Sequence, residues 1–234
     1  MERFYEKVAT VKGDSGWGVA LDGRAVKTPA RKDLIVPHEI FAEAIVAEWQ
    51  AQEDEIDPLA MGLTRLANTA LDRTAGNRPQ VIDEVAGYGN SDLLCYHAAD
   101  PLGLVQLQLK HWQPILDWLA ETHQAALTTT AEIAPVEQDI ASLRAIFSAI
   151  AQHDDFVLTG LHAATAVCGS VALGLALLEG RIDVTETWSC ALLDERYQAE
   201  RWGVEADVES GWESVRLEIS TAAEFMSLAQ NQAG

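Results

Sequence analysis

The acidic pair Asp194-Glu195 is the place in this sequence where a functional carboxylate is most strongly indicated. In a helix predicted over 184–202, five residues recur at steps of four, three, four and three, which places them on one stripe. They are Trp188, Leu192, Glu195, Ala199 and Trp202. We therefore expect the Glu195 carboxylate to lie between large apolar groups, where an ionised acid is costly unless it is paired or hydrogen-bonded.

Three interpretations of Glu195 remain open from the residues alone. It can be a structural acid satisfied by an internal Arg or a backbone donor. It can belong to a partner-binding face, where it meets a cation or backbone amides. It can be a general acid or base, so that a small-molecule enzyme using Glu195 with Asp194 is the alternative function. The enzyme interpretation ranks last because the sequence offers no companion catalytic group.

Motifs of known enzyme chemistry are missing from the sequence. It contains no Gly-x-x-x-x-Gly-Lys-Ser/Thr phosphate loop, no Gly-x-Ser-x-Gly elbow, and no His-Glu-x-x-His or Cys/His cluster. Gly87-Tyr88-Gly89 begins like a dinucleotide loop, but Asp92 stands where the third glycine is needed. We therefore expect a protein that is not an enzyme and has no metal and no cofactor.

The composition indicates a globular, strongly acidic protein. The 234 residues include 16 Lys and Arg against 36 Asp and Glu, for a formal net charge of -20. Such a chain repels nucleic acid and anionic lipid, so neither is expected as a partner. Its three cysteines form no Cys-x-x-Cys pair, which is typical of reduced thiols.

Two segments bear on localisation. Residues 1–6 have neither the apolar region of a signal peptide nor the composition of a transit peptide, so we expect a bacterial cytoplasmic protein. Residues 161–178 carry no charged side chain, but they are at the short limit for a membrane span and are diluted by polar residues and glycine. They are predicted to form a buried core helix, without membrane insertion.

The first third of the chain has strand and helix signals. Strands are predicted over 8–11, 17–21, 25–28 and 34–36, with a tight hairpin turn at Asp22-Gly23 because both positions tolerate positive φ. A helix begins at Pro37, where Phe41, Ile45 and Trp49 form an apolar stripe. A second helix is predicted over 63–72.

The rest of the chain has only helical periodicity. The predicted fold class is α+β, with an N-terminal α+β domain of β-hairpins plus helices at 1–76 and an all-α C-terminal helical bundle at 77–234. Gly169 and Gly174 are expected to mark tight helix crossings. The helices are predicted over 79–87, 103–120, 135–151, 160–178, 184–202 and 210–229.

Several segments, taken in order, resemble the F-type ATP synthase assembly factor 2 family, the chaperones of the α subunit. Together they cover roughly residues 4–207, and the ordered set is specific to that family. His97, Gly62 and Glu205 depart from the usual family residues at their positions. The matching segments are Leu21-Asp22-Gly23-Arg24, Lys27-Thr28-Pro29, Glu48-Trp49-x-x-Gln52, Ile56-x-Pro58, 63–72, Asp92-Leu93-Leu94-Cys95-Tyr96, Trp112-x-Pro114, Gly169-Ser170 and Asp194-Glu195-x-x-Gln198-x-Glu200-x-Trp202-Gly203.

The resemblance implies a chaperone that works without ATP hydrolysis and binds the free α subunit transiently, before the α subunit pairs with β. It favours the partner-binding interpretation of Glu195, together with Asp194, Gln198 and Trp202. The resemblance also implies structural anchoring by Trp49 and by the turn residues Asp22 and Gly23. A monomer is expected.

Overall fold

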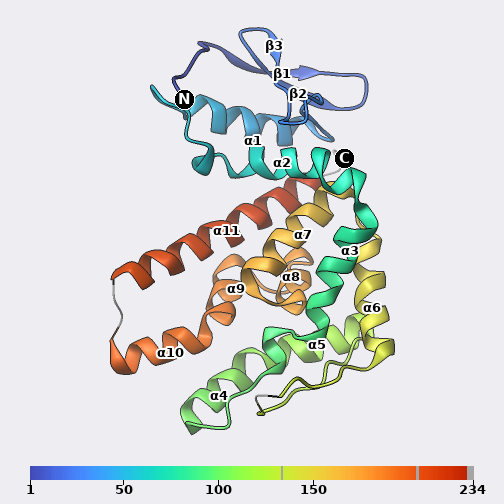
Figure 1. Ribbon diagram of the computed structural model, residues 1–234, viewed down its shortest axis with the longest axis vertical. Coiled ribbons are helices and arrows are strands. Elements are labelled where there is room, and N and C mark those ends of the chain that lie inside the picture. Colours follow the sequence, from blue (N-terminus) through green and yellow to red (C-terminus); the bar gives the residue numbers. More distant parts are fainter. Residues whose placement is uncertain (133, 204–205, 231–234) are drawn as a thin grey trace. The chain divides into compact units, whose positions relative to one another are not determined.

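The computed structural model describes residues 1–132, 134–203 and 206–230, and it has the predicted α+β architecture (Figure 1). Residue contacts divide the chain into two units. Unit 1 comprises Met1–Arg78, Asp154–Gly160 and residues 224–230, and unit 2 comprises Pro79–His153 and Leu161–Ala223. Each contact unit is thus made of segments that are not consecutive in sequence. The division into an α+β domain at 1–76 and a helical bundle at 77–234 stays a prediction.

Unit 1 contains a four-stranded antiparallel sheet in which β2 pairs with each of the other strands. The predicted Asp22-Gly23 turn is present, with φ values of 49° and 78°, and joins Leu21 to its cross-strand partner Arg24. The third strand is shorter than predicted and begins one residue earlier. The strands are β1 (Val8–Lys12), β2 (Trp17–Leu21), β3 (Arg24–Ala25) and β4 (Ile35–Val36).

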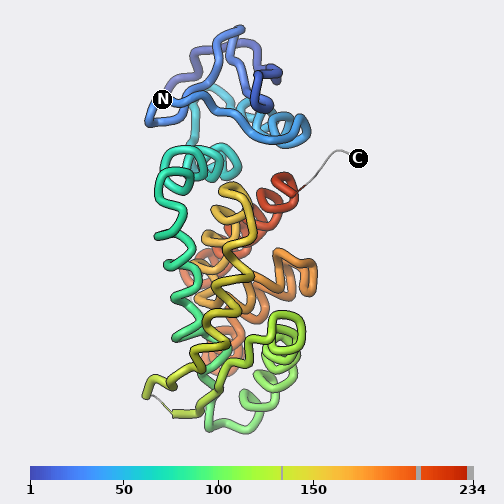
Figure 2. Tube along the Cα trace, turned by 90° about the vertical axis from the view of Figure 1, so that its right-hand side faces the viewer, coloured from blue at the N-terminus to red at the C-terminus, as the bar shows by residue number. Residues whose placement is uncertain are grey.

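Two helices, α1 (Glu39–Gln50) and α2 (Gly62–Asp72), follow the sheet, and α1 packs against β1 and β2 (Figure 2). The predicted apolar stripe of α1 points into the core, where Phe41 is fully buried. Its ring lies 5.0 Å from Phe225 and 5.9 Å from Phe156, both edge to face. Aromatic side chains from three distant parts of the sequence therefore close the core of unit 1.

The secondary structure of unit 2 is helical in its described residues, apart from an isolated bridge between Tyr96 and Thr130, and the unit is built around α8, every residue of which is buried. Most of the apolar segment 161–178 is therefore core, as predicted, although Ala166 is exposed. None of the helices in the described residues is long and apolar enough to cross a membrane. The helices that lie wholly or partly in unit 2 are α3 (Arg78–Gly87), α4 (Leu102–His111), α5 (Gln113–His123), α6 (Ile140–Ala151), α7 (Asp155–Cys168), α8 (Val171–Leu178), α9 (Val184–Ala191), α10 (Leu193–Trp202) and α11 (Ala206–Gln230).

Two of the long helices predicted for the second part of the chain are interrupted at residues that break helices. The predicted helix 103–120 is two helices, α4 and α5, because Pro114 in the first turn of α5 has no N–H to donate to α4. The predicted helix 160–178 ends at Gly169, whose φ of 63° turns the chain, and restarts at the N-cap Ser170. Gly169 is thus a turn residue, and the prediction that it marks a crossing is wrong.

Gly174 does lie at a close helix approach. A Cβ atom at this position would come within 3.1 Å of the Leu161 side chain and closer still to the Thr165 hydroxyl. The glycine therefore lets α8 pack tightly against α7 within unit 2. The predicted role of Gly174 is confirmed by this geometry.

Candidate functional site

The predicted helix 184–202 is also two helices, and this changes the setting of Glu195. Helix α9 ends at Ala191, and α10 begins at Leu193. Leu192 between them has φ and ψ of -109° and 19°, which are not helical. Residues before and after the break no longer share one continuous face. The Glu195 side chain is exposed, so the prediction that it lies between Trp188 and other apolar groups is wrong.

Helix α10 presents three predicted site residues to solvent. Glu195, Gln198 and Trp202 are spaced by three and four residues, so they lie along one side of the helix. The Trp202 side chain is 80% exposed. The carboxylate of Glu195 has no hydrogen bond or ion pair with any of the described residues. We call these three residues the α10 face.

Asp194, the fourth predicted site residue, has a different environment because it is half-buried. Its carboxylate accepts a hydrogen bond of 2.8 Å from Nε2 of Gln108 on α4. The Gln108 side chain is fully buried, and its Oε1 accepts a hydrogen bond of 2.7 Å from the N–H of Ala98. A continuous chain of hydrogen bonds thus ties the start of α10 to the segment before α4.

Burial raises the pKa of the Asp194 carboxyl, while the hydrogen bond from Gln108 and the nearby His97 lower it by a smaller amount. Nε2 of His97 lies 3.0 Å from the carbonyl oxygen of Leu94, and its ring packs against Trp112 with 5.7 Å between centroids. The indole of Trp112 donates in turn to the carbonyl of Cys190. His97 can attract the Asp194 carboxylate as a positive charge only when its imidazole ring is protonated.

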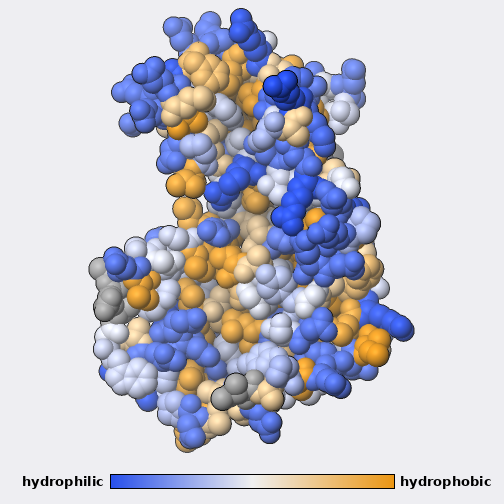
Figure 3. All heavy atoms as spheres, in the orientation of Figure 1, coloured by the Kyte–Doolittle hydropathy of each residue, from blue (hydrophilic) through white to orange (hydrophobic). Residues whose placement is uncertain are grey.

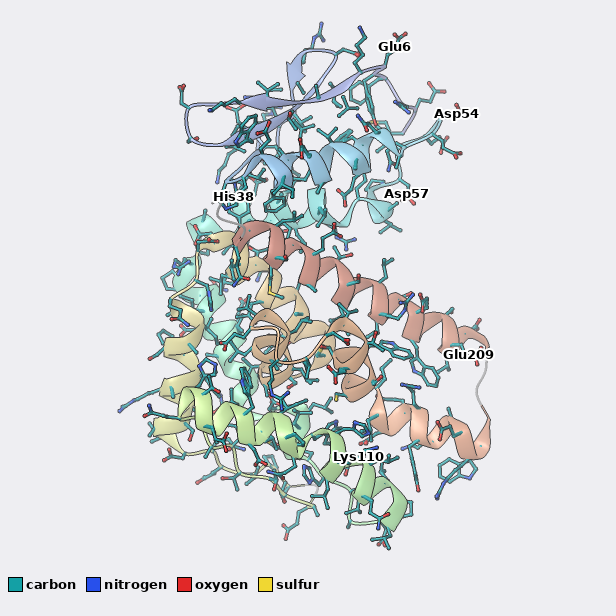
Figure 4. All side chains as sticks on the ribbon, turned by 180° about the vertical axis from the view of Figure 1, so that it is seen from behind. Glu6, His38, Asp54, Asp57, Lys110 and Glu209 are labelled. Carbon is teal, nitrogen blue, oxygen red and sulfur yellow. The ribbon has the colours of Figure 1, made fainter. Side chains whose placement is uncertain are left out.

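A cavity of about 250 Å³ lies where α4, α9 and α10 meet. Its lining includes Leu107, Leu193 and Tyr197, with Arg196 and Glu200. The close approach of α4 and α10 depends on Gly103, since a Cβ there would lie 2.8 Å from the Tyr197 hydroxyl. Figure 4 shows Lys110 on α4, in the last turn of the helix. Glu195 does not line this cavity, which gives it no enclosed partner for acid/base chemistry.

The predicted anchors Trp49, Asp22 and Gly23 belong to unit 1. The Trp49 ring packs edge to face on Tyr5 with 5.6 Å between centroids, and the Tyr5 hydroxyl donates to the Trp49 carbonyl at 2.8 Å. The Asp22 carboxylate accepts from the N–H of Lys7 at 2.8 Å, beside the turn that Gly23 completes. This geometry agrees with structural anchoring, and their role in the family stays a prediction.

Sequence reasoning missed the most deeply buried acid of unit 2. Asp92 has no exposed surface and accepts hydrogen bonds from Ser170 Oγ at 2.7 Å, Leu94 N at 3.0 Å and Ala172 N at 3.1 Å. It therefore fixes the turn after α3 to the N-terminus of α8, where the helix dipole favours a negative charge. Burial raises its pKa, and the hydrogen bonds oppose that shift. The only signal was its place in the motif Asp92-Leu93-Leu94-Cys95-Tyr96.

Glu48 was missed in the same way, beside Trp49 in its motif. Its carboxylate accepts from Leu63 N at 2.6 Å, from Thr64 N at 2.8 Å and from the Thr64 hydroxyl at 2.7 Å. Met61, the N-cap residue of α2, gives no side-chain cap, so Glu48 satisfies these backbone donors from α1. The glutamate therefore joins the two helices of unit 1.

The remaining reactive groups do not form a chemical centre. Burial raises the pKa of Cys95 and of Cys168 to about 12 and that of Cys190 to about 11, which keeps all three as thiols. Within residues 1–132, 134–203 and 206–230, no three His, Cys, Asp or Glu side chains gather as metal ligands would.

Comparison with known proteins identifies the family. A family model described as ATP12 chaperone protein matches residues 2–120. The chain belongs to the ATP12 chaperone family. Atp12 from Paracoccus denitrificans is 38% identical over 98% of both chains, with a TM-score of 0.93, and an aspartate-to-lysine mutant of that protein gives 0.92. The Atu1473 protein of Agrobacterium tumefaciens is 32% identical, over 97% of this chain and 85% of its own, with a TM-score of 0.92.

The family confirms the resemblance that the motifs indicated. This ATP12 family member is a chaperone of F1 ATP synthase assembly and not an enzyme. The similarity extends over nearly the whole chain, including α10, although the family model itself ends at residue 120. The alternative of carboxylate acid/base catalysis has no support from the family or from the exposed position of Glu195.

Proposed function

We propose that this ATP12 family member binds the free α subunit of the F-type ATP synthase transiently, as a monomer in the bacterial cytoplasm, before the α subunit pairs with β. An unassembled α subunit exposes the surface meant for β, and large exposed apolar surfaces aggregate. Covering that surface lowers the concentration of the aggregating species without any chemical step. Release follows when β offers a larger interface.

The observation that carries this proposal is the exposure of Trp202 on the α10 face. Tryptophan is among the residues that contribute most to binding at protein interfaces, and a side chain 80% exposed has most of that area left to bury. Its neighbours Glu195 and Gln198 add an acceptor and an amide beside it. An apolar anchor with polar groups beside it is a pattern found at interfaces, and here Trp202 forms the apolar end of the α10 face.

Asp194 holds the α10 face in position through its contact with α4. Its bond to Gln108 holds the first turn of α10 against α4, which fixes the direction in which Glu195 points. We assign Asp194 a positioning role and Glu195 a direct contact with a cation or with backbone amides of the α subunit. Glu195 then contributes mainly to specificity and to the rate of encounter.

The test is the aggregation of purified α subunit, followed by light scattering without ATP. A stoichiometric amount of the protein is expected to suppress scattering, and Glu195→Gln is expected to melt like wild type but to protect less. Glu195→Lys should protect least because it reverses the charge. The matched control is Glu121→Lys, which changes an exposed acid on α5 and should protect normally. Scattering as fast with the wild-type protein as without it would refute the proposal.

A further inference from the structure

The cavity of about 250 Å³ where α4, α9 and α10 meet has an arginine in its wall, Arg196, to which none of the roles described above applies. The cavity is smaller than the ~300–1,000 Å³ of typical ligand sites, so its size suits a single side chain. On the face drawn in Figure 3, hydrophilic and hydrophobic side chains mix over α4 and α10. Recognition at this end of unit 2 therefore depends on particular polar groups as well as on apolar area.

Two contacts place the Arg196 side chain at the cavity. Its guanidinium carbon lies over the Trp188 ring, 4.4 Å from the centroid. Its Nη1 lies 3.4 Å from the hydroxyl oxygen of Ser189, which also lines the cavity. Stacking on a ring uses the flat face of a guanidinium and leaves the N–H groups at its edge free to donate. Trp188 and Ser189 therefore hold the group in place while leaving it donors for another molecule.

Arg196 has no acid partner of its own among the described residues. This is unexpected in a chain with 36 Asp and Glu for 16 Lys and Arg, because a half-buried arginine is commonly paired with a carboxylate. Glu200 lines the same cavity one turn further along α10, but it is exposed and forms no ion pair with Arg196 within the part of the chain that the structure describes. The guanidinium is thus available to a carboxylate from outside.

The charge around the cavity also differs from that of the whole chain. Helices α4 and α10 together are neutral, whereas the chain has a formal net charge of -20. An acidic group that the rest of the surface repels therefore meets little repulsion here. The cations of the two helices are Lys110, Arg196 and Arg201, and the acids are Asp194, Glu195 and Glu200.

We propose that this cavity binds the carboxylate of an Asp or Glu side chain of the free α subunit, with Arg196 as its principal donor. The N–H groups of Arg196 donate to the carboxylate oxygens, and Leu107 and Leu193 pack on the methylene groups of the bound side chain. The α subunit as the source of the acid rests on the proposed function. The preference for a carboxylate rests on the cavity alone.

The probe is the capped peptide acetyl-Leu-Glu-Leu-amide, titrated into the full chain labelled with ¹⁵N. Its uncharged counterpart is acetyl-Leu-Gln-Leu-amide. The Glu peptide is expected to shift the backbone amide resonances of Ser189, Leu193 and Arg196 saturably. It should bind about tenfold more tightly than the Gln peptide, the effect of one charge-assisted hydrogen bond.

Two substitutions in the cavity wall should change this preference in opposite directions. Arg196→Gln should abolish it, because the charged donor is lost. Glu200→Gln, at an exposed position where folding is expected to be unaffected, should strengthen binding of the Glu peptide because it removes a like charge. The control Arg144→Gln, exposed on α6, should bind both peptides like wild type. Urea denaturation of each variant checks that the fold is kept.

The outcomes separate the cavity from the proposed function. Equal binding of the two peptides, or weaker binding of the Glu peptide to Glu200→Gln, overturns the carboxylate site even if the α subunit is still protected from aggregation. Saturating Glu peptide is expected to increase the amount of chaperone needed to protect the α subunit. Glu peptide bound without this competition overturns the assignment of the acid to the α subunit. Failure of the wild-type chain to protect the α subunit, with the Glu peptide still bound at Arg196, contradicts the proposed function instead.

Discussion

Asp92 and Glu195 are acids of unit 2 that have opposite environments. Asp92 is fully buried, and its two oxygens accept three hydrogen bonds from the chain itself. Glu195 is exposed on α10, and its carboxylate has no partner among the described residues. Both lie in motifs that identify the family, so sequence alone gives no reason to separate them.

The difference shows how the same chemical group serves stability in one place and recognition in another. A carboxylate whose acceptor capacity is used internally can contribute only to the fold. A carboxylate on an exposed face keeps that capacity for another molecule. Asp194 lies between the two extremes, half-buried and bonded to Gln108. Substitutions along this series should therefore move from effects on stability to effects on binding.

The largest effect is expected at the buried end of the series. Asp92→Ala leaves the Ser170 hydroxyl and the N–H groups of Leu94 and Ala172 without their acceptor. Breaking such a buried charged network costs about 3–5 kcal/mol of unfolding free energy. Urea denaturation measures this loss directly. Asp92→Asn should lose less, since its amide oxygen still accepts, and a loss below about 1 kcal/mol for the Ala variant would contradict the assigned role.

At the exposed end, Trp202→Ala should affect binding and leave stability unchanged. A tryptophan that anchors an interface contributes about 2 kcal/mol or more, so affinity for the isolated α subunit should fall about 30-fold. The unfolding free energy should change by no more than about 0.5 kcal/mol, because the side chain is 80% exposed. Titration calorimetry and urea denaturation give the two numbers. A large loss of stability with unchanged affinity would show that Trp202 serves the fold and not binding.

A smaller loss is expected at Glu48, the satisfied carboxylate of unit 1. Glu48→Ala removes the acceptor for Leu63 N and Thr64 N at the start of α2. Loss of a helix N-terminal cap costs about 1–2 kcal/mol. Circular dichroism during urea denaturation should show this decrease. Glu48→Gln, which retains one acceptor oxygen, should lose less, and equal losses for the two variants would show that capping is not the cause.

The sequence could predict the elements whose signals are local. The Asp22-Gly23 hairpin and the stripe of Phe41, Ile45 and Trp49 follow from turn chemistry and periodicity over a few residues. The breaks in the long helices were harder, because Pro114 and Gly169 lie in segments with continuous helical periodicity. The break at Leu192 has no proline or glycine beside it and could not be predicted.

The site was also predicted only in part, because only its local signals can be recognised in the sequence. Glu195 and Trp202 were predicted on one stripe of a helix, and both lie on α10. Gln198 was assigned to the site only through the family resemblance. The burial of Glu195 was predicted from a continuous helix, and the break at Leu192 removes it. The role of Asp92 could not be predicted because its acceptor bonds reach Ser170 and Ala172, 78 and 80 residues away. Such long-range partners leave no local pattern.

The smallest effect is expected at Asp194, where it depends on pH. Burial raises the pKa of this carboxyl in the folded chain, so ionising it costs more in the native than in the unfolded state. Its contribution to stability is therefore fully present below the unfolded pKa of about 4 and is lost as pH rises through the folded value. Asp194→Asn stays neutral, and its amide oxygen can still accept from Gln108. The variant should gain stability relative to wild type as pH rises from about 4 to 7, measured by urea denaturation at each pH. A relative stability that stays constant, or that falls, would show that the Asp194 carboxyl is solvated like that of Glu195. Asp92 would then be the one acid of this series that is buried by the fold.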